Sequence, residues 1–104
     1  DKIEQCGDYY SLSPRVNFVS GQWYTLTQEI QLNDPGSNNG YIKQWVNNTL
    51  VLDLQNISLR KSANIYIDQI KMDTFFGGST SDWAPNSDQY AYFDDFIVST
   101  NPLL

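Results

Sequence analysis

Histidine is absent from this 104-residue sequence, and cysteine occurs once, as Cys6. Without histidine the chain lacks the usual proton carrier at neutral pH and the commonest ligand of transition metals, which excludes zinc chemistry and Ser-His triads within it. A single cysteine allows no disulfide inside the chain. Phosphate-binding loops, nucleophile elbows and paired CxxC motifs are missing as well. The sequence therefore predicts no catalytic residue, no metal site and no cofactor.

Basic residues are also few. Six Lys and Arg stand against twelve Asp and Glu, so the net charge is −6 and a phosphate backbone would be repelled. No apolar run approaches the roughly 20 residues that span a bilayer. The acidic start DKIEQ lacks the features of a signal peptide, so we expect any secretion signal to have been removed. Nucleic acid and membrane are not expected partners.

Large apolar side chains are abundant, at 40% hydrophobic and 14% aromatic residues, so we expect a folded chain. Polar and apolar residues alternate in WYTLTQEIQL, residues 23–32, which predicts a half-buried strand. The following NDPGSNNG, residues 33–40, is typical of a surface loop. YIKQWV, Asn47-Asn48 and TLVLDL then predict a hairpin, because Asn tolerates the left-handed conformation of a tight turn.

The rest of the chain also favours strands. We expect Leu50, Leu52 and Leu54 to share a core face of the returning strand. Residues 64–76 predict another strand, with a β-bulge near Asp68-Gln69 where the alternation slips, and residues 90–99 predict a last one. With no helical periodicity, the sequence indicates about six strands in a single all-β domain over residues 1–104.

Three stretches, GQWYTLTQEIQLN at 21–33, residues 39–60 and residues 67–99, share their order and spacing with one known family. Together they resemble the C-terminal half of polysaccharide lyase family fourteen, the alginate and glucuronan lyases. The similarity runs from about Val16 to Thr100, and its most specific parts are TFFGG at 74–78, Trp83-Ala84 and YFDDF at 92–96. The family usually has Asn-Gly at the hairpin turn, where this chain has Asn47-Asn48. The resemblance implies a concanavalin-like jelly roll, which is a β-sandwich.

The resemblance also implies where the catalytic residues of the family are located. The family's catalytic lysine, arginine and pair of tyrosines belong to strands that precede the matched region, so no residue here inherits their roles. A jelly roll needs two stacked sheets. We therefore expect a second polypeptide chain to supply the N-terminal half of the fold, joined through an interchain disulfide at Cys6; an inert thiol is the alternative.

Two sequons, at Asn47 and Asn56, indicate a glycosylated, secreted protein. Chance also produces sequons, but the presence of two favours export, so we expect an extracellular localisation.

Tyr41, Lys43 and Trp45 alternate onto one strand face and are the first candidates for carbohydrate binding. An aromatic ring beside a cation suits a sugar, whose apolar face stacks while its polar groups seek donors. In the alternative interpretation Trp45 is sandwich core and Lys43 a solvated neighbour. Trp83, on the long loop 77–89, could form a wall for a polysaccharide, or it could anchor that loop to the sheet.

Carboxylates near the C-terminus offer a weaker case for a site. Asp88, Asp94 and Asp95 could ligate calcium, but their spacing is not that of an EF-hand, and we expect no bound metal. Asp94 or Asp95 is better explained by capping a backbone turn.

Two functions follow. The first is a carbohydrate-binding chain of a two-chain, lyase-like jelly roll, in which β-elimination on uronate polymers, if it occurs, is carried out by residues of the partner. The second is a non-catalytic lectin for neutral or complex glycans, which the acidic charge favours because polyuronates would be repelled. A purely structural fragment is a third alternative.

Overall fold

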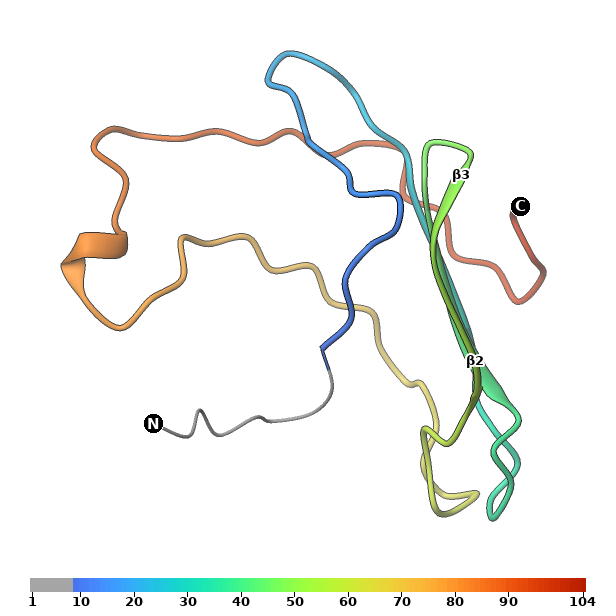
Figure 1. The fold of residues 1–104 in the computed structure, drawn as a ribbon. Coiled ribbons are helices and arrows are strands. Elements are labelled where there is room, and N and C mark those ends of the chain that lie inside the picture. Colours follow the sequence, from blue (N-terminus) through green and yellow to red (C-terminus); the bar gives the residue numbers. More distant parts are fainter. Residues whose placement is uncertain (1–8) are drawn as a thin grey trace. The chain divides into compact units, whose positions relative to one another are not determined.

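The computed structural model describes residues 9–104, and its regular structure is one antiparallel sheet (Figure 1). β1 (Leu26–Gln31), β2 (Gly40–Val46) and β3 (Thr49–Ile57) lie in the order β1-β2-β3, and a short 3-10 turn, η1, covers Ser81–Trp83. The prediction of a β protein is confirmed for this part of the chain. None of its helices is long and apolar enough to cross a membrane.

The predicted hairpin is confirmed. β2 and β3 pair on either side of Asn47-Asn48, and Asn47 has the expected left-handed backbone with φ 54°. Its amide donates to the carbonyl of Thr25 at 2.7 Å, while its side-chain Oδ1 accepts from the Thr25 amide at 3.1 Å. The turn therefore extends the pairing of β1 with β2 by one position beyond Leu26.

β3 carries two bulges that the sequence pattern did not reveal. One lies at Val51, because Gln44 pairs with Leu52 whereas the next residue, Trp45, pairs with Leu50. The other lies near Asn56, whose φ of 58° is left-handed, a conformation that Asn adopts more readily than other non-glycine residues. The bulge expected near Asp68-Gln69 is wrong, because no strand forms there.

Asn33 corrects the prediction that residues 33–40 are only a surface loop. Its side chain is fully buried, with 0% exposure. Oδ1 accepts the amides of Leu59 at 2.7 Å and Arg60 at 3.0 Å, and Nδ2 lies within 3.2 Å of four oxygens, those of Asp34, Ser37, Ser58 and Arg60. The Arg60 guanidinium donates a hydrogen bond from Nε to the Asn33 backbone carbonyl at 2.7 Å. One carboxamide thus fastens the start of the loop to the exit from β3.

Gly40, which ends this loop, is required by its backbone surroundings. A Cβ there would lie 2.9 Å from both the Gln31 and the Ile57 carbonyl oxygens and 3.1 Å from the Asn33 amide. These are main-chain atoms of the two neighbouring strands and the loop, so none can move aside cheaply. Only glycine lets β2 begin at this point between β1 and β3.

The expected core at Leu50, Leu52 and Leu54 is wrong. Val46 and Val51 are the buried apolar residues of the described chain, and Leu50 is exposed while Leu52 and Leu54 are half-buried. Val51 is covered because it lies in a bulge and its carbonyl accepts the amide of Ser13 at 2.8 Å, which brings the preceding segment alongside β3. Leu52 and Leu54 lack an opposing layer.

Residues 67–100 form a second unit, distinct from the one that holds the sheet. The strands predicted over residues 64–76 and 90–99 are wrong, since neither range contains a strand. Alternating side chains make a segment suitable for a sheet, but a strand also needs a neighbouring backbone in register with it. Within this unit the carboxylate of Asp94 accepts the amide of the adjacent Asp95 at 2.8 Å, whereas no turn is formed at these residues for it to cap.

Candidate functional site

The two faces of the sheet differ in chemistry. Residues paired across antiparallel strands point to the same side, so the register assigns each side chain to a face. Thr27 pairs with Trp45, Glu29 with Lys43, and Lys43 with Asp53. One face, which we call the polar face, carries Thr27, Glu29, Gln31, Tyr41, Lys43, Trp45 and Asp53, together with one apolar residue, Leu50, which pairs with Trp45.

Tyr41, Glu29 and Lys43 form a compact group at the middle of the polar face. The Tyr41 hydroxyl donates a hydrogen bond to Glu29 Oε1 at 2.7 Å. Lys43 Nζ lies 5.1 Å from the centre of the Tyr41 ring, within the range of a cation–π contact. The phenol of Tyr41 is therefore held by Glu29 at its hydroxyl and by Lys43 at its ring. The hydroxyl, the ammonium and the carboxylate are the polar groups that this arrangement offers to a ligand.

The pKa of Tyr41 is raised above that of an ordinary tyrosine. The hydrogen bond that it donates to Glu29 is the main cause, and partial burial and the negative charge of Glu29 add to it. At neutral pH the phenol is thus protonated and acts as a hydrogen-bond donor. A base that must take a proton from a substrate needs the opposite shift.

Replacing Glu29 by Gln is expected to bring the pKa of Tyr41 back toward its usual value, because both the charged acceptor and its field are removed. Tyrosinate absorbance, followed against pH in each protein and in its Tyr41→Phe counterpart, isolates this one group. Asp53→Asn is the control, since Asp53 bonds to Gln55 instead. The hydrogen bond to Glu29 stabilises the folded state fully at pH values below the usual tyrosine pKa. That contribution is lost as the pH rises through the raised pKa that Tyr41 has in the folded state. An equal shift in both variants would contradict the assignment.

Trp45 lies next to this group, two residues along β2 from Lys43, and its side chain is half-buried. Its indole is large, apolar and rigid, and its N–H is a donor. Thr27 is its partner on β1, and Lys43 is its neighbour on the same face of β2. The structure thus brings Tyr41, Lys43 and Trp45 together on one face. Such a face can stack a sugar ring while it donates hydrogen bonds to the hydroxyl groups of that sugar.

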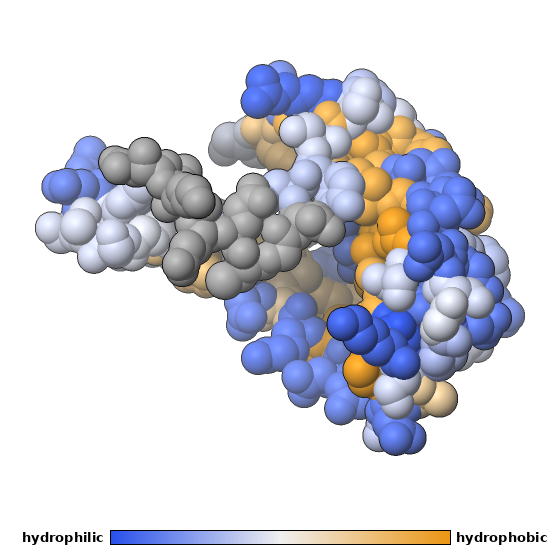
Figure 2. Space-filling view, turned by 60° about the horizontal axis from the view of Figure 1, so that its bottom comes forward, coloured by the Kyte–Doolittle hydropathy of each residue, from blue (hydrophilic) through white to orange (hydrophobic). Residues whose placement is uncertain are grey.

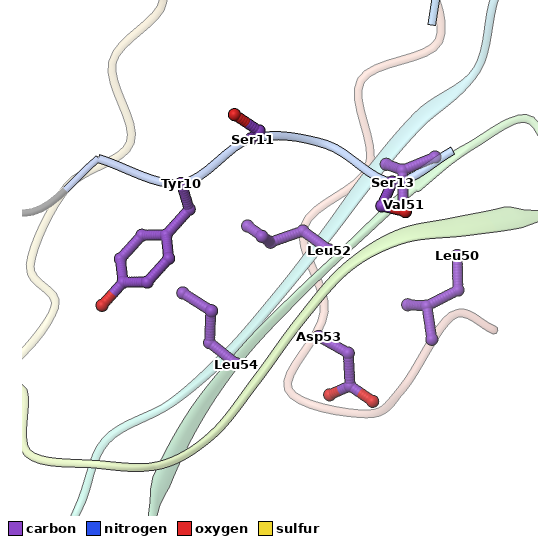
Figure 3. A pocket seen from close by; sticks show the side chains of 8 residues that line it. All are labelled: Tyr10, Ser11, Ser13, Leu50, Val51, Leu52, Asp53 and Leu54. Carbon is purple, nitrogen blue, oxygen red and sulfur yellow. The ribbon is translucent and has the colours of Figure 1, made fainter. Parts of the chain in front are cut away.

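The opposite side of the sheet, which we call the apolar face, consists of Leu26, Ile30, Ile42, Val46, Leu52 and Leu54, together with Gln28 and Gln44. Leu26 is 65% exposed and Ile30 is 40% exposed. Figure 2 shows hydrophobic residues gathered at the surface beside hydrophilic ones. In Figure 3 a shallow groove runs along β3, where Tyr10 lies against Leu52 and Leu54. The apolar face has the character of a surface that another layer covers.

Trp83 belongs to the second unit, residues 67–100. Its indole lies directly on Gly78, where a Cβ would overlap the ring, so it holds the Gly77-Gly78 stretch in place. Because Gly78 belongs to the same loop 77–89, this contact is internal to the loop, and the anchoring of the loop to the sheet stays a prediction. The ring remains 61% exposed, so a binding role for Trp83 stays a prediction.

The other predicted sites are the cysteine at position 6 and the two sequon asparagines. Cys6 lies outside the described residues, and the interchain disulfide remains a prediction. Asn47 and Asn56 are both exposed, and both have left-handed backbones. Within residues 9–104 no three His, Cys, Asp or Glu side chains gather as a metal site would require.

Sequence reasoning missed Glu29 and Asp53 as members of the site. The alternation of residues 23–32 already placed Glu29 on the polar side of its strand, but its partner could only be found once the register opposed it to Lys43. Asp53 escaped for the same reason, because its pairing with Lys43 depends on the bulge at Val51.

A family model described as Polysaccharide lyase 14 matches residues 2–96 of this chain. The match includes all three strands and η1, and it begins well before Val16, where the similarity was expected to start. No curated protein and no solved structure matches the chain.

Proposed function

We propose that this chain, which belongs to the polysaccharide lyase 14 family, binds a polysaccharide across the polar face of its sheet. The observation that carries the proposal is the fixed group of Tyr41, Glu29 and Lys43 beside the indole of Trp45. Stacking on Trp45 would supply affinity, and the phenol, carboxylate and ammonium would orient the sugar by hydrogen bonds. Trp83, in the second unit, is proposed separately as a carbohydrate-binding residue.

The catalytic residues of the assembled protein are proposed to belong to a second polypeptide. The apolar face supports this arrangement, since a sheet with exposed Leu26 and Ile30 requires a covering layer to exclude water from them. The protonated phenol of Tyr41 also suits binding better than proton abstraction. A bridge through Cys6 would hold the two chains together. A single species of this chain's own mass, seen equally with and without reductant, would exclude the bridge.

A second function, a secreted lectin without catalysis, is favoured by charge. The polar face carries two carboxylates, Glu29 and Asp53, against one ammonium, and the whole chain has a net charge of −6. Such a surface repels polyuronates unless its partner is strongly basic.

Titration of the intact protein with alginate, glucuronan and a neutral polysaccharide decides between these functions. We expect saturable binding to at least one polymer by calorimetry. A simultaneous rise in ultraviolet absorbance, from new unsaturated ends, identifies a lyase, whereas binding without that rise identifies a lectin. Absence of binding to every polymer would refute the proposed function.

A further inference from the structure

The segment that leads into β1 carries a tryptophan, Trp23, that is not part of the site described above. Trp23 is 71% exposed, and it lies in the same unit as the sheet. The next residue, Tyr24, is fixed in place: its ring meets Phe18 edge-on at 4.9 Å, and its hydroxyl accepts the Val19 amide at 2.9 Å. The loop before β1 is therefore held by Tyr24, next to the exposed Trp23.

The register indicates which side of the sheet Trp23 faces. Thr25 continues the pairing of β1 with β2, because it exchanges hydrogen bonds with Asn47. Side chains alternate along an extended segment, so Trp23 and Thr25 share the side of Thr27. Thr27 pairs with Trp45 on the polar face. Trp23 and Trp45 are thus placed on the same face.

The separation of the two indoles defines what they could bind together. Trp23 precedes Thr27 by four residues, and at about 3.3 Å per residue this is roughly 13 Å along the strand. One pyranose ring is too short to reach both. A glycan chain of several rings, running from Trp45 along the start of β1 and the segment that precedes it, could stack on each of them in turn.

We propose that Trp23 is a second aromatic subsite and that the polar face accommodates an extended glycan chain, several sugar rings long, which stacks on Trp45 and Trp23. This inference rests on the proposed function, since Trp45 supplies the first platform. It specifies the ligand class as the interior of a polymer instead of a terminal monosaccharide. Both platforms use ring stacking, which tolerates different sugars provided that each presents an apolar ring face.

The test compares short and long probes on the intact protein. A disaccharide and a hexasaccharide, each prepared from alginate and from cellulose, are titrated against wild type, Trp23→Ala and Trp45→Ala. Trp23→Ala is expected to weaken hexasaccharide binding roughly tenfold, the loss of one stacking contact, and to leave disaccharide binding unchanged. Trp45→Ala should weaken both. Tyr66→Ala, another exposed aromatic of the same unit, is the control and should change neither.

The outcomes separate the two proposals. Unchanged hexasaccharide affinity in Trp23→Ala, with loss in Trp45→Ala, overturns the second subsite and leaves the proposed function intact. Unchanged affinity in both variants overturns both. If Trp23→Ala unfolds, Trp23→Leu replaces it, because leucine keeps apolar bulk but has no aromatic ring on which a sugar can stack. Acrylamide quenching gives an independent readout when wild type is compared with Trp23→Phe, because the difference isolates the emission of Trp23 from that of Trp45 and Trp83. The hexasaccharide should protect Trp23 and the disaccharide should not, and an indole already protected in the free protein would show a structural role instead.

Discussion

Replacing Asn33 by alanine is expected to lower the free energy of unfolding of the intact protein by about 3 kcal/mol, because several buried polar groups would lose their partner. The Leu59 and Arg60 amides lose an acceptor, and the oxygens around Nδ2 lose a donor. Unfolding in urea, followed by tryptophan fluorescence, measures the change as a lower midpoint. Asn33→Asp should also destabilise, since its charge would face carbonyl oxygens that now accept from Nδ2.

Asn39→Ala is the matched control, because Asn39 is an exposed asparagine of the same loop. It makes hydrogen bonds with Asp34 alone, at 2.8 and 2.9 Å, and its removal leaves groups that water can satisfy. A loss of about 1 kcal/mol or less is expected. If the two alanine variants unfold at the same urea concentration, Asn33 does not connect the loop to β3 in the way described.

Trp45→Ala is expected to weaken polysaccharide binding at least about tenfold, because the stacking platform at the centre of the polar face disappears. Calorimetry with the polymer that wild type binds best provides the measurement. Trp45→Phe should recover part of the affinity. Urea unfolding of each variant separates lost binding from lost structure, which also tests the alternative that Trp45 is only packing.

Gln44→Ala provides the control for Trp45. Gln44 is adjacent on β2, is also half-buried, and lies on the apolar face. Its removal should leave polysaccharide affinity unchanged. Equal weakening by Gln44→Ala and Trp45→Ala would contradict the assignment of binding to the polar face.

The sequence predicted the parts of this fold that local chemistry determines. Alternation in residues 23–32 and the two asparagines at the turn were sufficient to predict β1 and the β2–β3 hairpin. Asn33 could not be recognised, since the amides that it binds lie 26 and 27 residues away. The strands expected over residues 64–76 and 90–99 failed for a related reason, because periodicity says nothing of whether a neighbouring backbone is available.

The candidate site was predicted to a similar extent. Tyr41, Lys43 and Trp45 share a face because they alternate on one strand, and this required no knowledge of other segments. Glu29 and Asp53 come from different strands, and the bulge at Val51 determines which β3 residue faces Lys43. Pairwise geometry across strands is therefore the part that alternation alone does not specify.

The contact between Asn33 and Ser58 has a consequence for the order of events in biosynthesis. Ser58 is the third residue of the sequon at Asn56, and in the folded chain its hydroxyl is engaged by Asn33 Nδ2 and the Arg60 carbonyl, each at 3.2 Å. A transferase that must engage the same hydroxyl would have to displace these two contacts in the folded chain, although Ser58 and Asn56 are both exposed. Sugar attachment at Asn56 would therefore compete with the contact between Asn33 and Ser58, and it would meet no such competition before residues 33–60 close.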